Sequence, residues 1–444
     1  MNIVHLELLL MTQLMILGMT DIISQMKRLR IRRWWTKPHI LRQVRDEFGA
    51  YATIFMYFKL NDHEEFYEFT GMTVIEFSII LNLVADDLTS TSNRPGLSPE
   101  LKLAAVLNFL RHGNNVRSHS WYFRIGRSTM YKLIATVTPL IYAKLADEYF
   151  KIPQSEDEWI QIAQDIYSLY GFPQCCGVLD GRHFRIRQPA NSGALCYSWK
   201  KFYSIVLMAL CDAHLRFIYA SVGHRGGRND SGIFNVCSLC QAIERGEIRL
   251  PRPSRLPNSR VVSPYTFIAD GGFGLKKFVM TPYRNPEFKT LEQMIFEIRL
   301  TEVRKNVERA FGILVIRFQI FDARLSFSRA TSQNIILCTM AIHNFLITSR
   351  LDAGGENAAQ RDNPSSDFEE SDDDSDDGLA FPNVADFSPQ PVRGDAFVRR
   401  ENVGVDDEIQ IEEANLLDGD AIRDRLSIYF VTEGAVDWQW NKLP

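Results

Sequence analysis

Two aspartates and one glutamate have the residue types and the settings to bind a divalent cation. Asp180 and Asp270 each close an apolar, strand-like run and are each followed by glycine, and Glu308 lies beside the apolar face of a helical pattern. Two strand-end carboxylates and one helical carboxylate can meet at one edge of a sheet. Oxygen ligands of this kind suit Mg²⁺ or Mn²⁺, which can activate water against a phosphodiester. Taken singly, each acid is as well explained as a turn, cap or surface residue.

Other residues near these acids have less specific roles. Asp212 ends a second strand-like run and competes as a ligand, while Asp230 lies in the loop sequence GGRNDSG. We interpret Asp230 as a loop residue that lies near the site, because Asx side chains often cap a following helix. Arg304 lies on the same helical turn as Glu308. His183 could contact a substrate or be a hydrogen-bonded structural histidine.

The elements that must position the acids form an α/β pattern. Strand-like runs cover residues 175–180, 202–212, 217–224 and 265–270, and helical patterns cover 233–246 and 300–318. Three adjacent strands, a helix, a further strand and a helix predict a mixed sheet packed against helices.

Residues 1–170 read as an all-α region with a helix-turn-helix pattern. Ser98 is an expected N-cap with Pro99 at the first helical position, and short helices at 117–125 and from 127 follow. In this reading DNA faces the side chains Arg127, Ser128, Thr129 and Lys132. The alternative is an ordinary helical bundle in which Ser128 and Thr129 cap the third helix. The apolar stretch 8–19 is too short to span a bilayer and is expected to be an amphipathic or core helix.

Charge is unevenly distributed along the 444 residues. Residues 1–350 hold 43 Lys and Arg against 30 Asp and Glu, whereas residues 351–444 hold 7 against 24. A basic body with an acidic tail is typical of a nucleic-acid binder. The expected units are a helical region (1–170), an α/β domain (171–350), a disordered acidic linker (351–405) and a C-terminal docking segment (406–444) with an amphipathic helix at 421–431.

Several motifs together resemble the Harbinger-type (PIF/Harbinger) transposases and the nucleases derived from them. The matching stretches, in order, are RRWW (32–35), IGRSTMYKL (125–133), IPQSEDEW (152–159), GVLDGRHFRI (177–186), the segment 201–234, FIADGGFGL (267–275), VRKNVERAFGIL (303–314) and HNFL (343–346). The resemblance implies a ribonuclease H-like fold in which Asp180, Asp270 and Glu308 form a DDE triad that binds Mg²⁺ or Mn²⁺. Where this family carries proline after the aromatic residue that follows the second aspartate, this chain has Gly274.

The resemblance predicts a divalent-metal-dependent DNA endonuclease in the nucleus, with the cytoplasm as a second location. Asp180 would bridge two ions, and Arg182, Arg185 or Arg304 would hold phosphates. A Myb-like DNA-binding partner protein is implied, and no membrane association is expected. Two alternatives remain: a domesticated protein that binds DNA or chromatin without cutting, and an active transposase that also joins DNA ends.

Overall fold

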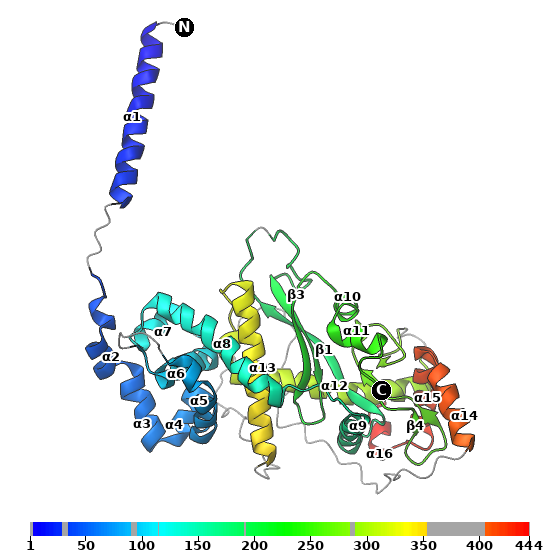
Figure 1. The fold of residues 1–444 in the computed structure, drawn as a ribbon. Coiled ribbons are helices and arrows are strands. Elements are labelled where there is room, and N and C mark those ends of the chain that lie inside the picture. The colour runs from blue at the N-terminus through cyan, green and yellow to red at the C-terminus, as the bar shows by residue number, and fades with distance from the viewer. Residues whose placement is uncertain are drawn as a thin grey trace.

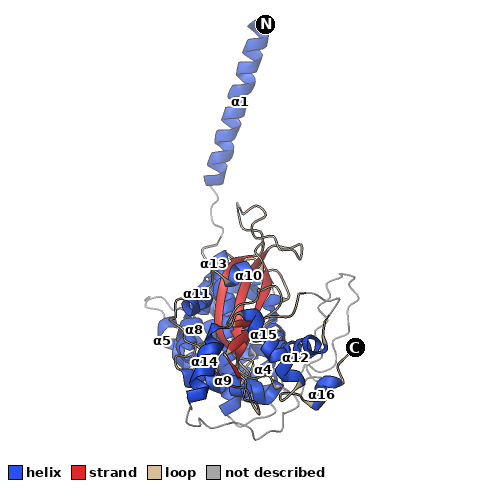
Figure 2. Ribbon diagram, turned by 90° about the vertical axis from the view of Figure 1, so that its right-hand side faces the viewer, coloured by secondary structure: helices blue, strands red, loops and turns tan. Residues whose placement is uncertain are grey.

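A mixed sheet lies between a helical region and a group of C-terminal helices in this computed structural model (Figure 1). The structure describes residues 3–28, 34–89, 96–113, 115–190, 192–284, 289–352 and 405–443. Seen from the side, the strands form a central layer with helices around it (Figure 2). The predicted α/β architecture with a helical N-terminal region is therefore confirmed.

The main sheet has five strands in the order β3-β2-β1-β6-β7. These strands are β1 (Cys175–Arg185), β2 (Ser204–Cys211), β3 (Phe217–Arg225), β6 (Thr266–Ile268) and β7 (Val279–Met280). β1, β2 and β3 pair antiparallel, whereas β6 pairs parallel with both β1 and β7. A small hairpin of β4 (Ser254–Arg255) and β5 (Val262–Ser263) lies outside this sheet.

Both faces of the sheet are buried, which explains the unbroken apolar run in the second strand. All eight residues of β2 are buried, and their side chains alternate between two hydrophobic clusters as strand geometry requires. Leu207 belongs to the cluster shared with the long helices α12 (Leu291–Arg317) and α13 (Arg329–Asp352). Met208 belongs to the opposite cluster, which includes Trp159 and Phe234. The continuous hydrophobicity of β2 therefore reflects its central place.

Helices on the second face are α9 (Glu156–Tyr170), α10 (Asp230–Phe234) and α11 (Ser238–Glu244). The segment 233–246, predicted as one helix, is thus divided between α10 and α11. The break occurs at Cys237, whose extended backbone begins α11 as its N-cap and whose sulfur accepts a hydrogen bond from the Cys240 N–H at 3.5 Å. Both thiols are buried.

The region before the sheet consists of helices whose starts were readable from capping residues. They are α1 (Ile3–Arg28), α2 (Arg42–Phe48), α3 (Met56–Asn61), α4 (His63–Thr70), α5 (Val74–Leu88), α6 (Pro99–His112), α7 (Val116–Tyr122) and α8 (Arg127–Tyr149), with short turns of helix at Pro38–Ile40 and Tyr51–Phe55. Ser98 caps α6 by accepting a hydrogen bond from the Leu101 N–H, as predicted. The N-cap of α8 is Gly126, without a side-chain hydrogen bond. The expectation that Ser128 and Thr129 cap this helix is therefore wrong, while the helix-turn-helix and the helical bundle both stay predictions.

Helix α1 stands away from the rest of the chain (Figure 1). Its apolar side chains are exposed, including Leu10 at 60% and Leu14 at 59%. The expectation of a core helix is therefore wrong, because no other described segment covers its apolar side chains. Among the described residues, no single helix is long and apolar enough to cross a membrane, although α4 and α5 satisfy that test together as a pair bent by 50°.

The C-terminal helices are α14 (Val405–Leu416), α15 (Gly419–Val431) and α16 (Asp437–Trp440). Of the three, α15 and α16 pack against α12, and α14 packs against β5. Arg299 of α12 is buried among them and donates hydrogen bonds to the Gly171 carbonyl and to Gln439. Its guanidinium lies 4.7 Å from the centre of the Phe430 ring. The acidic stretch 355–380, predicted to be disordered, lies outside the described residues.

We expect Phe430→Ala to lower the free energy of unfolding by about 3–5 kcal/mol, because deleting a buried ring leaves a cavity. Phe430 is fully buried, and its ring centre lies 5.1 Å from that of Phe172. Ile428→Ala on the same helix is the matched control, because Ile428 is 57% exposed. Urea unfolding measures both variants. Equal midpoints for Phe430→Ala and the wild type would show that α15 is not part of the cooperative fold.

Candidate functional site

Parallel strand pairing brings Asp180 and Asp270 to the same place. Val178 of β1 is paired with Ile268 of β6, and each aspartate follows its paired residue by two positions. Because residues two apart on a strand point to the same face, both carboxylates lie on the face of Val178 and Ile268, which pack in the cluster with α12.

The sequence suggested that Asp180 ends its strand, but the strand continues beyond it. β1 continues to Arg185 because β2 supplies hydrogen-bonding partners along it, with Asp180 opposite Ala209. What ends near Asp180 is the pairing with the short strand β6. The aspartate is therefore held by backbone on one side and open toward α12 and Asp270 on the other.

Glu308 reaches this face from α12 and is linked to Asp270 by one arginine. Arg304 lies one turn earlier on the same helix, as predicted. Its Nη1 is 3.7 Å from an Asp270 carboxylate oxygen, and its Nη2 is 3.7 Å from a Glu308 carboxylate oxygen. The structure therefore brings the three predicted acids and Arg304 to one side of the sheet.

Asp230 approaches from the opposite face. A side-chain carbon added at Gly181 would stand 2.5 Å from Oδ1 of Asp230, and one added at Gly272 would stand 3.4 Å from its Oδ2. Gly181 points away from the α12 face because its neighbour Asp180 points toward it. The sequence context of Asp230 suggested that it caps the following helix, but it does not. Asn229 does so, by accepting a hydrogen bond from the Gly232 N–H at 3.2 Å.

The electrostatics of the four acids reflect their crowding. Burial raises the pKa of Asp180 to about 7, and the charges of Glu308 and Asp230 add to this rise while Arg304 opposes it. Burial also raises the pKa of Asp230 and of Glu308, and the charge of Asp270 adds to both. Carboxyls that raise one another's pKa gain from any added positive charge.

The donor set suits a hard divalent cation in kind, because it consists of carboxylate oxygens. Its arrangement does not yet surround such an ion. Within the described ranges, no three His, Cys, Asp or Glu side chains are placed as ligands of one ion. Arg304, which bridges Asp270 and Glu308, supplies a positive charge at this position instead.

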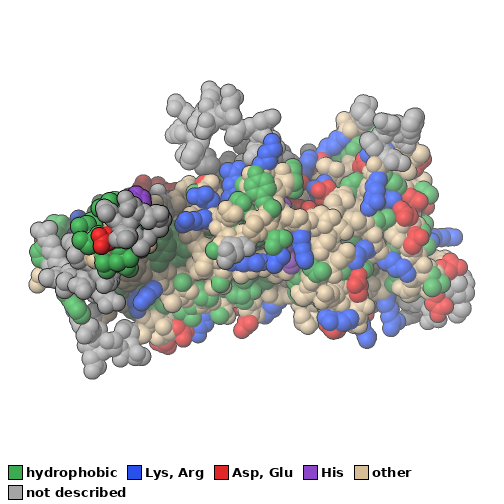
Figure 3. Space-filling model, turned by 90° about the horizontal axis from the view of Figure 1, so that it is seen from above, with side chains coloured by type: hydrophobic (Ala, Val, Ile, Leu, Met, Phe, Trp, Pro, Cys, Tyr) green, Lys and Arg blue, Asp and Glu red, His purple; other side chains and the backbone are tan. Residues whose placement is uncertain are grey.

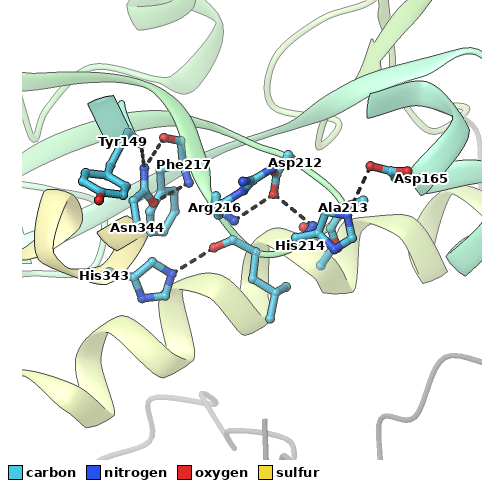
Figure 4. A network of polar contacts seen from close by, with 11 residues as sticks. Tyr149, Asp165, Asp212, Ala213, His214, Arg216, Phe217, His343 and Asn344 are labelled. Atoms are coloured by element: carbon cyan, nitrogen blue, oxygen red, sulfur yellow. Dashed lines mark hydrogen bonds and ion pairs between the residues drawn. The ribbon is translucent and has the colours of Figure 1, made fainter. Parts of the chain in front are cut away.

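Asp212 is a structural residue. It is buried and accepts hydrogen bonds from the N–H groups of His214 (2.9 Å) and Arg216 (2.8 Å) and from Nε of Arg216 (2.7 Å). These bonds shape the turn between β2 and β3 (Figure 4). His214 in turn pairs with Asp165 of α9 at 3.1 Å, and this contact is the largest cause of the raised pKa of His214.

His343 and Asn344, the first two residues of the HNFL motif, fix the same turn from α13 (Figure 4). His343 Nε2 lies 2.9 Å from the Leu215 carbonyl. The Asn344 amide donates to the carbonyls of Tyr149 and Phe217, each at 2.7 Å, and accepts from the Phe217 N–H at 2.9 Å. The motif thus ties α13, α8 and the sheet together. Sequence reasoning used it only for the resemblance.

The other predicted residues are His183, four residues at the start of α8, and Gly274. His183 shares a hydrogen bond of 2.8 Å with Ser204, and burial, followed by the charge of Lys200, lowers its pKa to about 4. Arg127, Ser128, Thr129 and Lys132 are exposed at the start of α8, in the helical region. Gly274, where the resembled family carries proline, has φ of +79°, a conformation that proline cannot adopt.

Comparisons with known proteins agree with this geometry. Residues 179–344 match the family model described as DDE superfamily endonuclease. The match begins beside Asp180, ends at Asn344 and contains Asp270 and Glu308. No solved structure matches the chain.

Curated relatives cover most of the folded chain at low identity. Putative nuclease HARBI1 of Xenopus laevis is 24% identical over 309 residues, which cover 68% of this chain and 84% of that protein. Protein ALP1-like of Arabidopsis thaliana is 27% identical over 281 residues, covering 61% and 68%. Protein Antagonist of Like Heterochromatin Protein 1 of Arabidopsis thaliana is 26% identical over 282 residues, covering 61% and 70%. The resemblance to Harbinger-derived nucleases is therefore confirmed.

We expect Asp180→Asn to stabilise the cation-free protein at neutral pH. With its pKa raised to about 7, folded Asp180 keeps a proton that the unfolded chain releases near pH 4, so wild-type stability falls as pH rises between these values. Asparagine cannot ionise, so the variant does not lose stability in this way. Its free energy of unfolding should exceed that of the wild type by on the order of 2 kcal/mol at pH 8 and should equal it near pH 4. Thermal melts in EDTA across this range measure it. A variant less stable than wild type at pH 8 would make Asp180 a structural residue.

Asp212→Asn should have the opposite effect. The amide would turn an N–H toward the Arg216 side chain, which is itself a donor, and the buried contacts of the turn would be lost. We expect a loss of about 1–3 kcal/mol in the free energy of unfolding at pH 7. Urea unfolding of the Asp180 and Asp212 variants side by side distinguishes an acid kept for function from one kept for the fold.

Proposed function

We propose that this chain, whose residues 179–344 form a DDE superfamily endonuclease domain related to Harbinger-derived nucleases, hydrolyses DNA phosphodiesters with the help of divalent cations. The observation that carries the proposal is the convergence of Asp180 and Asp270 with Glu308 of α12, which one arginine links to Asp270. We assign the sheet and its flanking helices to a ribonuclease H-like arrangement.

In this proposal the acids hold the cation and Arg304 contacts the substrate. Asp180, Asp270 and Glu308 would hold Mg²⁺ or Mn²⁺, with Asp180 between the other two. Divalent ions held there supply positive charge to the scissile phosphate and make water more acidic. Arg304, which neutralises Asp270 and Glu308 without a cation, can then turn its guanidinium to a phosphate. Asp230 adds negative charge from the other face of β1.

The rest of the chain has roles that follow from its charge. We assign the helical region 1–170 to DNA contact through Arg127 and Lys132 at the start of α8, residues 171–350 to cleavage, 351–405 to an acidic linker and 406–444 to docking. A nuclear location and a Myb-like partner protein belong to the same proposal. The excess of Lys and Arg in residues 1–350 supports binding to a polyanion.

A second candidate function is DNA or chromatin binding without cleavage. The observation that favours it is the bridge that Arg304 forms between Asp270 and Glu308, which satisfies two of the acids without a cation. A protein that has lost cleavage could keep this pairing permanently. The name of one plant relative refers to heterochromatin.

We expect Asp180→Asn to reduce cleavage on the order of 10³-fold or more while DNA affinity stays within twofold, because binding rests on basic side chains elsewhere. Glu308→Gln should behave alike, and Asp230→Asn should slow cleavage only in part. The measurement is nicking of mixed duplex and single-stranded DNA with Mg²⁺ or Mn²⁺.

Asp87→Asn is the matched control. Asp87 lies on α5, where it pairs with Lys144 at 2.9 Å and is about half exposed, so this variant should cut like the wild type. Cleavage by Asp180→Asn near the wild-type rate would refute the mechanism. DNA binding by the wild type with no cleavage under either cation would establish the second function.

A further inference from the structure

The connection between β1 and β2 contains a rigid hairpin. We call residues 192–203 the β1–β2 hairpin. Tyr197 and Tyr203 form a β-bridge with ring centres 5.2 Å apart. The Ser198 N–H donates to the Phe202 carbonyl at 2.8 Å, and the Lys201 N–H donates to the Ser198 carbonyl at 3.1 Å. These bonds close a tight turn whose central residues are held in place by the backbone.

The tip of this turn presents a tryptophan to solvent. Trp199 is 80% exposed, although its neighbour Ser198 is buried. The Nζ atom of Lys200 lies 5.3 Å from the centre of the Trp199 ring. The turn therefore holds a large aromatic ring outside the core with a cation beside it.

The surroundings of this ring are basic. The hairpin carries Lys200 and Lys201 directly after Trp199, and residues 192–203 contain no Asp or Glu. Arg225 and Arg228, both exposed, line an open depression of about 630 Å³ together with residues 192–195 of the hairpin. Seen from above, Lys and Arg side chains gather around hydrophobic ones on this face (Figure 3). Positive charge around an exposed aromatic ring suits a nucleic-acid strand.

The hairpin is also next to the acids. The Gly227 N–H donates to the Leu195 carbonyl of the hairpin at 3.3 Å, and Asp230 follows three positions later in the chain. The Phe202 ring of the hairpin lies 6.5 Å from the ring of His183 on β1. A strand that contacts the hairpin tip therefore runs past the side of β1 from which Asp230 approaches.

We propose that the β1–β2 hairpin holds one strand of the DNA by stacking Trp199 on an unpaired base, while Lys201, Arg225 and Arg228 contact the neighbouring phosphates. This inference deepens the proposed function by naming its substrate: DNA with an unpaired nucleotide near the scissile phosphate. The ring needs an unpaired base because the bases of an intact duplex are already stacked on each other. Stacking on a ring fixed by the backbone costs little conformational entropy.

The test is DNA binding by the full chain in EDTA, where no cleavage takes place. Fluorescence anisotropy compares a duplex with one unpaired nucleotide and the same duplex fully paired. We expect wild type to prefer the unpaired site, Trp199→Ala to lose that preference with roughly tenfold weaker binding, and Trp199→Phe to keep most of it. Trp440→Ala, which changes another solvent-accessible tryptophan, is the control and should bind like wild type.

A second measurement separates stacking from charge. Lys201→Ala should weaken both duplexes alike and lower the slope of log affinity against log salt by about one. Equal binding of both duplexes by wild type and Trp199→Ala would overturn the inference, as would an equal loss on both duplexes in Trp199→Ala. A chain that binds as expected but does not cut with Mg²⁺ or Mn²⁺ would lose the proposed function and keep this one.

Discussion

The mutual repulsion of carboxylates at one edge of the sheet is the constraint on which the rest of the structure depends. Burial and then the charges of neighbouring acids raise the pKa of Asp180, Asp230 and Glu308, and Arg304 pairs with Asp270 and Glu308. Such a cluster costs stability, so it persists only where the surrounding fold determines its position. Parallel pairing of β1 with β6 fixes two of the acids. Helix α12 fixes the third, and α12 is in turn packed against α13 and the C-terminal helix α15.

Asp212 and Asp180 have different environments, and this contrast supports the proposal that Asp180 belongs to the functional site. Asp212 is buried with three donors on its carboxylate, so its charge is fully compensated within the fold. Asp180 is crowded by other acids and accepts one short-range hydrogen bond, from the Gly181 N–H at 2.8 Å. A buried carboxylate whose charge is incompletely satisfied is what a site for an external cation requires. Asp180 and Asp212 both end apolar runs in the sequence, but their carboxylates have different environments in the structure.

The sequence predicted most of the elements that carry the acids, because apolar runs and capping residues depend on local chemistry. What it missed depends on contacts between distant segments. Asp180 lies inside β1 because β2 extends the pairing, which an apolar run ending at Leu179 cannot reveal. The observed caps of α8 and α10, Gly126 and Asn229, precede the predicted ones by one to three residues. The exposed ring of Trp199 depends on a turn closed by backbone bonds, and nothing in the local pattern distinguishes it from a core tryptophan.

The glycine that follows Asp180 has a steric reason, because Asp230 lies beside it. Asp230 comes from α10 and lies against the backbone after Asp180 and the backbone after Asp270 at once, close to Gly181 and Gly272. A side-chain carbon at Gly181 would stand 2.5 Å from the Asp230 carboxylate, a distance that would force α10 away from β1. Gly181 therefore allows Asp230, which comes from the opposite face of the sheet, to approach the backbone beside Asp180, whereas Gly271, the residue directly after Asp270, has open space around it.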